Sequence, residues 1–446
     1  MQIDRALLKQ FDVPAPRYTS YPTALSFREL EPGELEAGMA GDGPLSLYFH
    51  LPFCRSLCWY CACTKVITRD QSKSADYLAQ LEVELDQRMP FLQGRNVVQI
   101  HLGGGTPTFF LPDELRTLGK MIRARLSVAQ DAEISVEIDP REVTREHIAA
   151  LRDAGFNRAS LGVQDHNPEV QKIIHREQPL EQTRQVVDWL REFGFSAINF
   201  DLIYGLPGQT SASFRETIAD VIQMRPDRLA VYSYAHVPWA APAQKLLERH
   251  PMPSADAKLE LFAQAAEQFV NAGWTHIGMD HFALPDDALA IALETGNLRR
   301  NFQGYSTWKG TDIHGFGMSS ISQTQTMYFQ NARELDDWNA KLDGGASVVD
   351  RGITLTTEDH VRRDVIMAIM CSNRVEFDGF SRDHDVDFAN HFTDELAELQ
   401  TFAAQGLVKI DATGFRVTAT GRFFVRNIAA IFDTYRQRQS GFSKAV

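Results

Sequence analysis

Four of the five cysteines in this 446-residue chain lie within ten residues of one another. They stand at Cys54, Cys58, Cys61 and Cys63, so that three, two and one residues separate successive thiols. A disulfide framework spreads its cysteines along a secreted chain, whereas a tight run is typical of thiolate ligation in a reducing compartment. The run therefore predicts a metal centre. Cys371 follows an apolar helical stretch, and we expect it to be a buried thiol.

The spacing of Cys54, Cys58 and Cys61 favours an iron–sulfur cluster over zinc. Three closely spaced thiolates can hold three corners of a [4Fe–4S] cluster and leave the fourth iron open to an exchangeable ligand. A structural zinc site normally needs a second cysteine or histidine pair, and no second cysteine pair follows in the sequence. A zinc-stabilised interaction protein is the simpler alternative, and it predicts neither iron nor colour.

Alternating strand and helix patterns place the cysteines directly after the first strand of a β–α series. Short apolar runs indicate strands, and apolar residues at helical spacing separate them. Such alternation predicts parallel strands with right-handed crossovers, arranged either as an open or partial barrel or as a flat doubly wound sheet. Both arrangements gather ligand-binding residues at the carboxyl ends of the strands. The predicted strands are residues 45–50, 97–102, 134–138, 158–163, 197–203 and 228–234.

Several residues at these strand ends are candidate ligand contacts. Gly103, Gly104 and Gly105 end the second strand, where a backbone without side chains can approach a ligand closely. A tight strand-to-helix turn is the alternative reading of the glycines. Glu137 ends the third strand and Asp201 lies in the fifth, so both could bind ribose hydroxyls or merely act as caps.

The pattern changes beyond residue 351, where helices and a hairpin predict a small C-terminal α+β domain that resembles a winged helix. The stretch 280–317 is expected to be an irregular site loop. Prolines near the N-terminus favour extended chain there. We therefore expect an N-terminal extended arm (1–40), a catalytic domain (41–350) and a C-terminal domain (351–446). The expected C-terminal elements are helices at 357–371 and about 394–404, a hairpin of 407–410 with 415–418, and a last helix.

The composition is that of an ordinary folded protein, with 44% hydrophobic and 23% charged residues. A formal net charge of −13 argues against a chain-wide nucleic-acid surface. No apolar run is long enough to span a membrane, and the N-terminus does not resemble a signal peptide. We therefore expect a cytoplasmic protein. We also expect a monomer, an expectation that does not follow from these quantities.

The pattern C-x₃-C-x₂-C, with Tyr60 just before the third cysteine, resembles the radical S-adenosylmethionine (SAM) superfamily. Together with Cys63, the segment 16–23 (PRYTSYPT) and the segment 103–107 (GGGTP), nearly the whole chain resembles the oxygen-independent coproporphyrinogen III oxidases. The resemblance implies an α/β fold, with a partial (β/α)6 barrel of radical SAM type and a small C-terminal winged-helix-like α+β domain. It also implies that a [4Fe–4S] cluster on the first three cysteines cleaves SAM into a radical.

In that family, the radical takes hydrogen from a propionate of coproporphyrinogen III and carbon dioxide leaves. Two propionates become vinyl groups, which gives protoporphyrinogen IX in anaerobic heme biosynthesis. The resemblance implies two SAM molecules side by side, and a catalytic Cys63 that is not a cluster ligand. The residues that match the first SAM site are Tyr48, Gly104, Glu137 and Ile321, and those that match the second are Tyr60, Gly105, Thr106, Gln164, Arg176, Asp201 and Ala235.

Ala62, Leu102, Leu284 and Trp308 depart from the family pattern, mainly on the substrate side. A radical SAM enzyme that acts on another tetrapyrrole is therefore an alternative. A heme-binding chaperone of the same superfamily is a second alternative, and the presence of Cys63 argues against it. The expected partners are a tetrapyrrole substrate and an electron donor and acceptor that the sequence does not identify.

Overall fold

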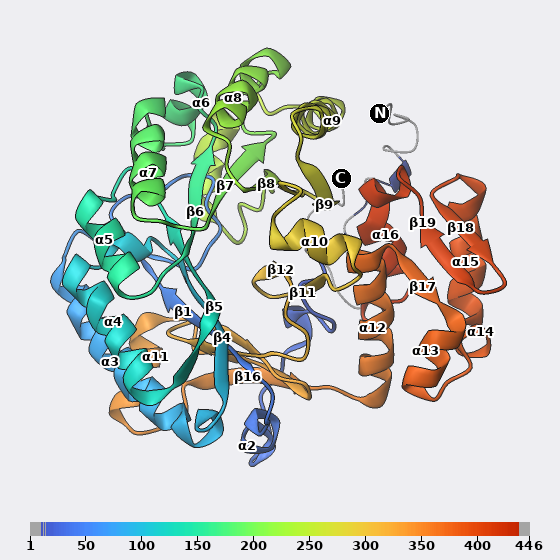
Figure 1. The fold of residues 1–446 in the computed structure, drawn as a ribbon, viewed down its shortest axis with the longest axis horizontal. Coiled ribbons are helices and arrows are strands. Elements are labelled where there is room, and N and C mark those ends of the chain that lie inside the picture. Colours follow the sequence, from blue (N-terminus) through green and yellow to red (C-terminus); the bar gives the residue numbers. More distant parts are fainter. Residues whose placement is uncertain (1–9, 12, 14, 437–446) are drawn as a thin grey trace. The chain divides into compact units, whose positions relative to one another are not determined.

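The computed structural model describes all residues except 1–9, 12, 14 and 437–446. The chain divides into two compact units (Figure 1). The barrel unit comprises residues 28–265 and 310–354, and the terminal unit comprises the described residues of 1–27, 266–309 and 355–446. One of the four boundaries between them along the chain falls within helix α9 (Ala255–Asn271).

Six parallel strands form the centre of the barrel unit, and each one pairs with the next along the chain. A doubly wound sheet would instead reverse its strand order at a switch point. The consecutive order therefore confirms the partial barrel and excludes the flat alternative. The strands are β1 (Leu45–Leu51), β4 (Asn96–Gly104), β5 (Ser127–Ile138), β6 (Arg158–Gln164), β7 (Ala197–Tyr204) and β8 (Arg228–Ser233).

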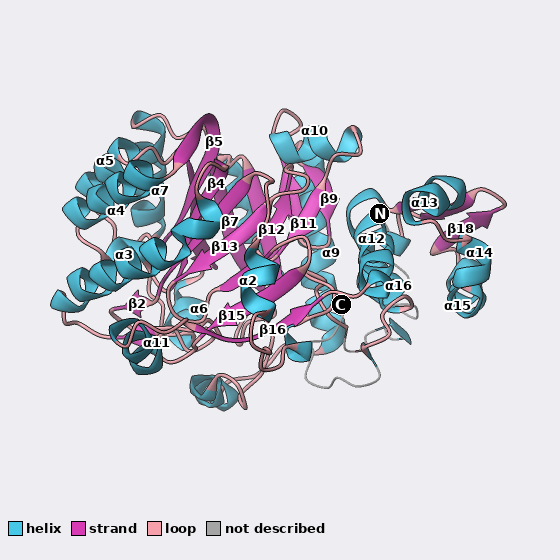
Figure 2. Cartoon of the chain, turned by 90° about the horizontal axis from the view of Figure 1, so that it is seen from below, coloured by secondary structure: helices cyan, strands magenta, loops and turns pink. Residues whose placement is uncertain are grey.

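Helices follow the strands and cover the outer side of this sheet (Figures 1 and 2). Each buries its apolar side, as Leu81 and Leu85 do in α3, where both are fully buried. Polar caps set where some of them begin: the Thr144 side chain accepts the His147 N–H at the start of α5. The helices are α3 (Ser72–Leu92), α4 (Pro112–Arg125), α5 (Arg145–Asp153), α6 (Pro168–Ile173), α7 (Leu180–Glu192) and α8 (Ser211–Met224).

Strand β1 is central, because it pairs with β4 on one side and in parallel with β13 (Asp312–Phe316) on the other. The sheet continues from β13 through three antiparallel strands. They are β14 (Ile321–Gln323), β15 (Met327–Asn331) and β16 (Val349–Thr354), and the adjoining helices are α2 (Glu34–Met39) and α11 (Leu335–Asp343).

The prediction of an irregular loop over 280–317 is wrong. This stretch holds short strands and a helix, which were missed because elements of three to seven residues are too short to show a periodic pattern. They are β10 (His281–Ala283), α10 (Ala288–Glu294), β11 (Arg299–Asn301), β12 (Gly304–Ser306) and the start of β13, and they follow β9 (Thr275–Gly278).

The C-terminal part of the terminal unit confirms the predicted helices and hairpin, with Cys371 buried in α12. A third strand, β17, joins the hairpin in the antiparallel order β17–β19–β18, and its three residues gave no signal in the sequence. The elements are α12 (Thr357–Ser372), β17 (Arg374–Glu376), α13 (Phe377–His384), α14 (Phe388–His391), α15 (Thr393–Ala404), β18 (Val408–Asp411), β19 (Gly414–Val417) and α16 (Val425–Ala430).

The predicted N-terminal arm is irregular from residue 15 to residue 23, with neither helix nor strand. Residues 1–9, 12 and 14 of that arm lie outside the described part of the chain. Further along, η1 (Ala24–Ser26) and α2 interrupt the segment, so it is not extended throughout. The division of the chain into three segments stays a prediction. In the described residues, no helix has the length and apolar character to cross a membrane.

Candidate active site

The cysteine loop, residues 52–65, begins directly after β1. Its two ends are joined by a short parallel pair, β2 (Phe53–Cys54) with β3 (Val66–Ile67). Inside the loop, the Lys65 ammonium donates to the carbonyl oxygens of Cys61 and Cys63, each at 3.1 Å. These contacts fix the part of the loop that carries the last two thiols.

A cavity of about 310 Å³ opens over this loop at the carboxyl ends of β4 to β8. The parallel strands bring together residues that are far apart in the sequence, as expected for this architecture. Most predicted site residues line the cavity. They are Cys54, Cys58, Tyr60, Cys61, Cys63, Gly104, Gly105, Thr106, Glu137, Gln164, Arg176 and Asp201.

Three predicted residues do not line the cavity. Tyr48 lies behind it in β1, where its ring stacks on His101 with 5.8 Å between centroids. His101 Nε2 lies 3.4 Å from a Glu137 carboxylate oxygen, so Tyr48 is one residue removed from the cavity wall. Ala235 follows β8, and its carbonyl accepts a hydrogen bond from Gln244 at 3.1 Å. Ile321 begins β14 and is half-buried.

The glycine run has a structural reason for its composition. Gly104 has φ +109°, and a Cβ on it would meet the His50 ring. The Gly104 N–H donates to Glu137 at 3.2 Å, and the Gly105 N–H donates to the Leu51 carbonyl at 2.9 Å. In this structure, both N–H groups hold the turn, which corresponds to the alternative reading of the glycines.

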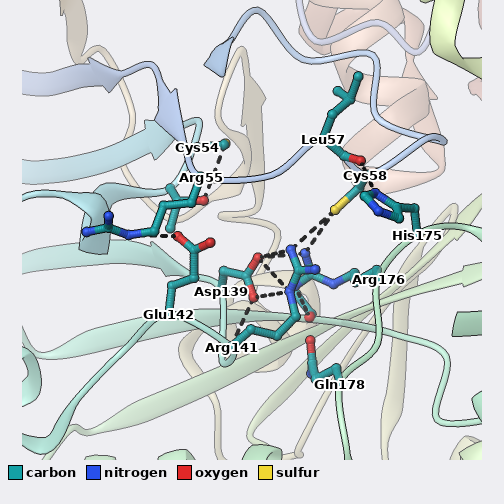
Figure 3. Close-up of polar contacts among 12 residues, drawn as sticks. Cys54, Arg55, Leu57, Cys58, Asp139, Arg141, Glu142, His175, Arg176 and Gln178 are labelled. Atoms are coloured by element: carbon teal, nitrogen blue, oxygen red, sulfur yellow. Dashed lines mark hydrogen bonds and ion pairs between the residues drawn. The ribbon is translucent and has the colours of Figure 1, made fainter. Parts of the chain in front are cut away.

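Asp139 and Arg141 also line the cavity and were missed in the sequence, although they come directly after the third predicted strand. Arg141 holds the Asp139 carboxylate through Nε and Nη2, and Arg176 Nη1 reaches the same carboxylate at 2.8 Å (Figure 3). Burial alone would raise the pKa of Asp139, but the two guanidinium charges outweigh it and lower the pKa to about 2. Asp139 is therefore an anion at any physiological pH.

The two acids predicted to bind ribose differ in their surroundings. Burial raises the pKa of Asp201 to about 6, although Ser160 donates a hydrogen bond to it at 2.8 Å. Burial also acts against ionisation of Glu137, but hydrogen bonding and charge from His101 leave its pKa below the usual value. Both carboxylates can accept hydrogen bonds from hydroxyl groups near neutral pH. On acidification, Asp201 is protonated before Glu137.

The three thiols assigned to a cluster also differ. Burial raises the pKa of Cys54 to about 12, despite a neighbouring Thr106 hydroxyl at 3.4 Å. A hydrogen bond with Cys63 lowers the pKa of Cys61 to about 6. Cys58 Sγ accepts hydrogen bonds from two guanidinium groups, those of Arg141 and Arg176.

These residues fit a [4Fe–4S] cluster. All three thiols face one cavity, and thiolates are the ligands that such clusters use. In the described residues, no three Cys, His, Asp or Glu side chains converge closely enough to hold a single metal ion. The spacing of the three thiols and their shared cavity wall match the ligand set of a [4Fe–4S] cluster with one open iron.

The matching family models and the similar proteins of known function indicate the same family. Residues 48–221 match the Radical SAM superfamily, and residues 355–424 match the HemN C-terminal domain. The oxygen-independent coproporphyrinogen III oxidase of Pseudomonas aeruginosa is 44% identical over 440 residues, which cover 97% of this chain and 96% of that protein. The enzyme of the same name from Escherichia coli is 43% identical, over 99% of this chain and 98% of that protein.

A solved structure supports the same assignment at the level of the fold. The coproporphyrinogen III oxidase from Escherichia coli, described as a radical SAM enzyme, superimposes with a TM-score of 0.94 at 43% identity. The match covers 98% of this chain and 99% of that one. This chain therefore belongs to the oxygen-independent coproporphyrinogen III oxidases of the radical SAM superfamily.

Proposed function

We propose that this chain converts two propionate side chains of coproporphyrinogen III to vinyl groups by oxidative decarboxylation and so makes protoporphyrinogen IX. The observation that carries the proposal is the cavity at the strand ends, with three cysteines of radical SAM spacing in its wall. The full-length similarity to enzymes of that name supports the same substrate. The departures at Leu102 and Trp308 leave the catalytic cavity untouched, since neither residue lines it.

In this proposal Cys54, Cys58 and Cys61 hold the cluster, and the other wall residues position SAM beside it. When bound, the cluster supplies the electron that splits SAM, whose adenosyl fragment then removes a hydrogen atom from the propionate. Glu137 and Asp201 accept hydrogen bonds from the ribose hydroxyl groups of SAM. The cavity walls hold the reacting groups in line, which is a main contribution of a protein to such chemistry.

The proposed site holds two SAM molecules. The support is that most of the assigned residues line one cavity and come from neighbouring strand ends: Gly104, Gly105 and Thr106 at β4, Glu137 at β5, Gln164 and Arg176 at β6 and the segment after it, and Asp201 in β7. We assign Tyr48, Gly104, Glu137 and Ile321 to the first SAM molecule. We assign Tyr60, Gly105, Thr106, Gln164, Arg176, Asp201 and Ala235 to the second.

Cys63 acts as a catalytic residue in this proposal. It is exposed in the cavity wall, and its carbonyl is held by Lys65. The proposal also includes the catalytic domain at 41–350, the C-terminal domain at 351–446, a cytoplasmic monomer, and an external electron donor and acceptor.

The test is an anaerobic assay with coproporphyrinogen III, SAM and a reductant, together with metal analysis. We expect brown protein with about four irons per chain, and release of carbon dioxide with formation of protoporphyrinogen IX. Cys58→Ala should lose both iron and activity, because two thiolates do not hold the cluster. Cys371→Ala is the matched control and should keep both, since that thiol is buried in α12. One zinc per chain without iron would refute the proposal.

A further inference from the structure

The cluster thiols differ in the charge of their hydrogen-bond donors. Cys58 Sγ accepts from Arg141 Nη2 at 3.4 Å and from Arg176 Nη1 at 3.6 Å (Figure 3). The hydrogen-bond partners of the Cys54 and Cys61 sulfur atoms are a neutral hydroxyl and a neutral thiol instead. The charges of Lys65 and Arg176 act on Cys61 without a hydrogen bond to its sulfur. One corner of the site is thus provided with two cationic N–H donors, which form stronger hydrogen bonds than neutral ones.

The two guanidinium groups are held in place by Asp139. Arg141 donates Nε to Oδ1 at 3.0 Å and Nη2 to Oδ2 at 2.7 Å, while Arg176 donates Nη1 to Oδ2 at 2.8 Å. Arg176 is further anchored by the Gly162 carbonyl at 2.7 Å. The side chains of Asp139 and Arg176 are 9% and 7% exposed and that of Arg141 is 15% exposed, so solvent screens the arrangement only weakly.

The backbone on both sides of the Cys58 thiol is held by the segment that leads into Arg176. The Leu57 carbonyl accepts a hydrogen bond from His175 Nδ1 at 2.8 Å (Figure 3). The Trp59 N–H donates to the Ile174 carbonyl at 3.0 Å. The Trp59 ring also stacks on the His175 ring, with centroids 5.1 Å apart. The distance from this sulfur to its donors is therefore fixed by the fold and does not depend on a mobile side chain alone.

We propose that Arg141 is a positioning residue which raises the reduction potential of the cluster through its hydrogen bond to Cys58. The proposal rests on the proposed function, because it requires the cluster on these thiols. Reduction adds one electron, taken from a low-potential donor, and the added negative charge is shared with the thiolate sulfurs. A cationic N–H donor on a sulfur stabilises that charge more in the reduced state than in the oxidised state.

The test compares Arg141→Gln with Arg55→Gln by reductive titration of the reconstituted protein, followed by electron paramagnetic resonance. Arg55 is the matched control because it lies on the cysteine loop but is directed at Glu142, away from the Cys58 thiol (Figure 3), and donates a hydrogen bond to Gln71. At a fixed potential we expect the ratio of reduced to oxidised cluster to fall about tenfold in Arg141→Gln, a shift of about 59 mV for one electron. Arg55→Gln should titrate as the unchanged protein does.

Arg141→Lys should restore part of the shift, because an ammonium keeps the charge without the fixed donor geometry. If Arg141→Gln binds no iron, the reduction potential of Arg141→Lys is compared with that of the unchanged protein instead. An unchanged potential in the Arg141 variants, or an equal fall in Arg55→Gln, would overturn the inference while leaving the cluster in place. Absence of iron from the unchanged protein would instead overturn the proposed function.

Discussion

Gln244 joins the cysteine loop to the loop that follows β8, and its removal is a sharp test of how the second SAM site is built. It is 1% exposed and lies in the 3₁₀ segment η3 (Pro242–Arg249). Its Nε2 donates to the carbonyls of Tyr60 at 2.8 Å and Ala235 at 3.1 Å, and its Oε1 accepts the Val237 N–H at 2.6 Å. The two carbonyls belong to residues that we assign to the second SAM molecule.

Gln244→Leu keeps a similar volume but removes all three hydrogen bonds. Each backbone group left buried without a partner costs about 1 kcal/mol or more, so the local loss is about 3 kcal/mol. Part of it should appear as displacement of Tyr60 and Ala235 from their binding positions. A share of about 1.4 to 2.8 kcal/mol corresponds to binding of the second SAM that is about 10- to 100-fold weaker.

The assay is anaerobic equilibrium dialysis of the iron-loaded protein with labelled SAM, alongside thermal unfolding. We expect one SAM site to keep its affinity and the other to weaken. The control is Thr324→Val, because Thr324 is buried, donates to the Gly38 carbonyl at 2.8 Å and accepts from the Met327 N–H at 3.1 Å, in the barrel unit but outside the cavity. The reasoning would be refuted if Gln244→Leu and Thr324→Val lost the same amount of stability and each still bound both SAM molecules with unchanged affinity.

Three further predictions concern single side chains. Cys63→Ser should keep the iron and SAM binding and lose turnover; loss of iron would make Cys63 a ligand. The pKa of Asp201 is raised to about 6, so the folded protein keeps a proton on this carboxyl up to about that pH. Proton binding to Asp201 therefore stabilises the folded state at low pH, and the free energy of unfolding falls as the pH rises from the pKa of the unfolded chain to about 6. Denaturant unfolding of the unchanged protein and of Asp201→Asn at pH 4.5 and 7.5 tests this, because the variant should not show that fall in the free energy of unfolding. The same fall between the two pH values in both proteins would contradict the prediction. Glu84→Leu should cost about 3 to 5 kcal/mol in urea unfolding, because it leaves the buried Arg88 without its ion-pair partner and removes the acceptor of three buried donors, those of Gly317, Asn331 and Trp338. Arg88→Met in the same chain should recover only the part of the loss that comes from the unpaired charge.

The barrel strands could be predicted closely because each contains a short run rich in buried apolar residues. The predicted strand 158–163 compares with β6 at Arg158–Gln164, and 197–203 compares with β7 at Ala197–Tyr204. Strand β5 begins seven residues earlier than predicted, at Ser127, because its first half is polar and half-exposed. Burial decides the hydrophobic pattern, so the exposed half of a strand leaves little trace in the sequence.

The cavity could be predicted in part for a related reason. Parallel strands gather their carboxyl ends, so Glu137 and Asp201 could be placed together without a structure. Asp139 and Arg141 were missed because their role depends on contact with Arg176 and Cys58, which lie far along the chain. Gln244 was missed for the same reason, since it lies outside any strand and acts on backbone carbonyls. Such contacts depend on tertiary packing and have no local sequence pattern.

The central place of β1 has a consequence for the order of events during protein synthesis. The strand that leads into the cysteine loop completes its second edge only when it pairs with β13, which begins at Asp312. At usual elongation rates, the chain from Cys61 to Asp312 takes on the order of ten to fifty seconds to emerge. For that time one edge of β1 is unpaired. The residues that line the cavity end at Tyr232, so all of them are synthesised before β1 is paired on both edges.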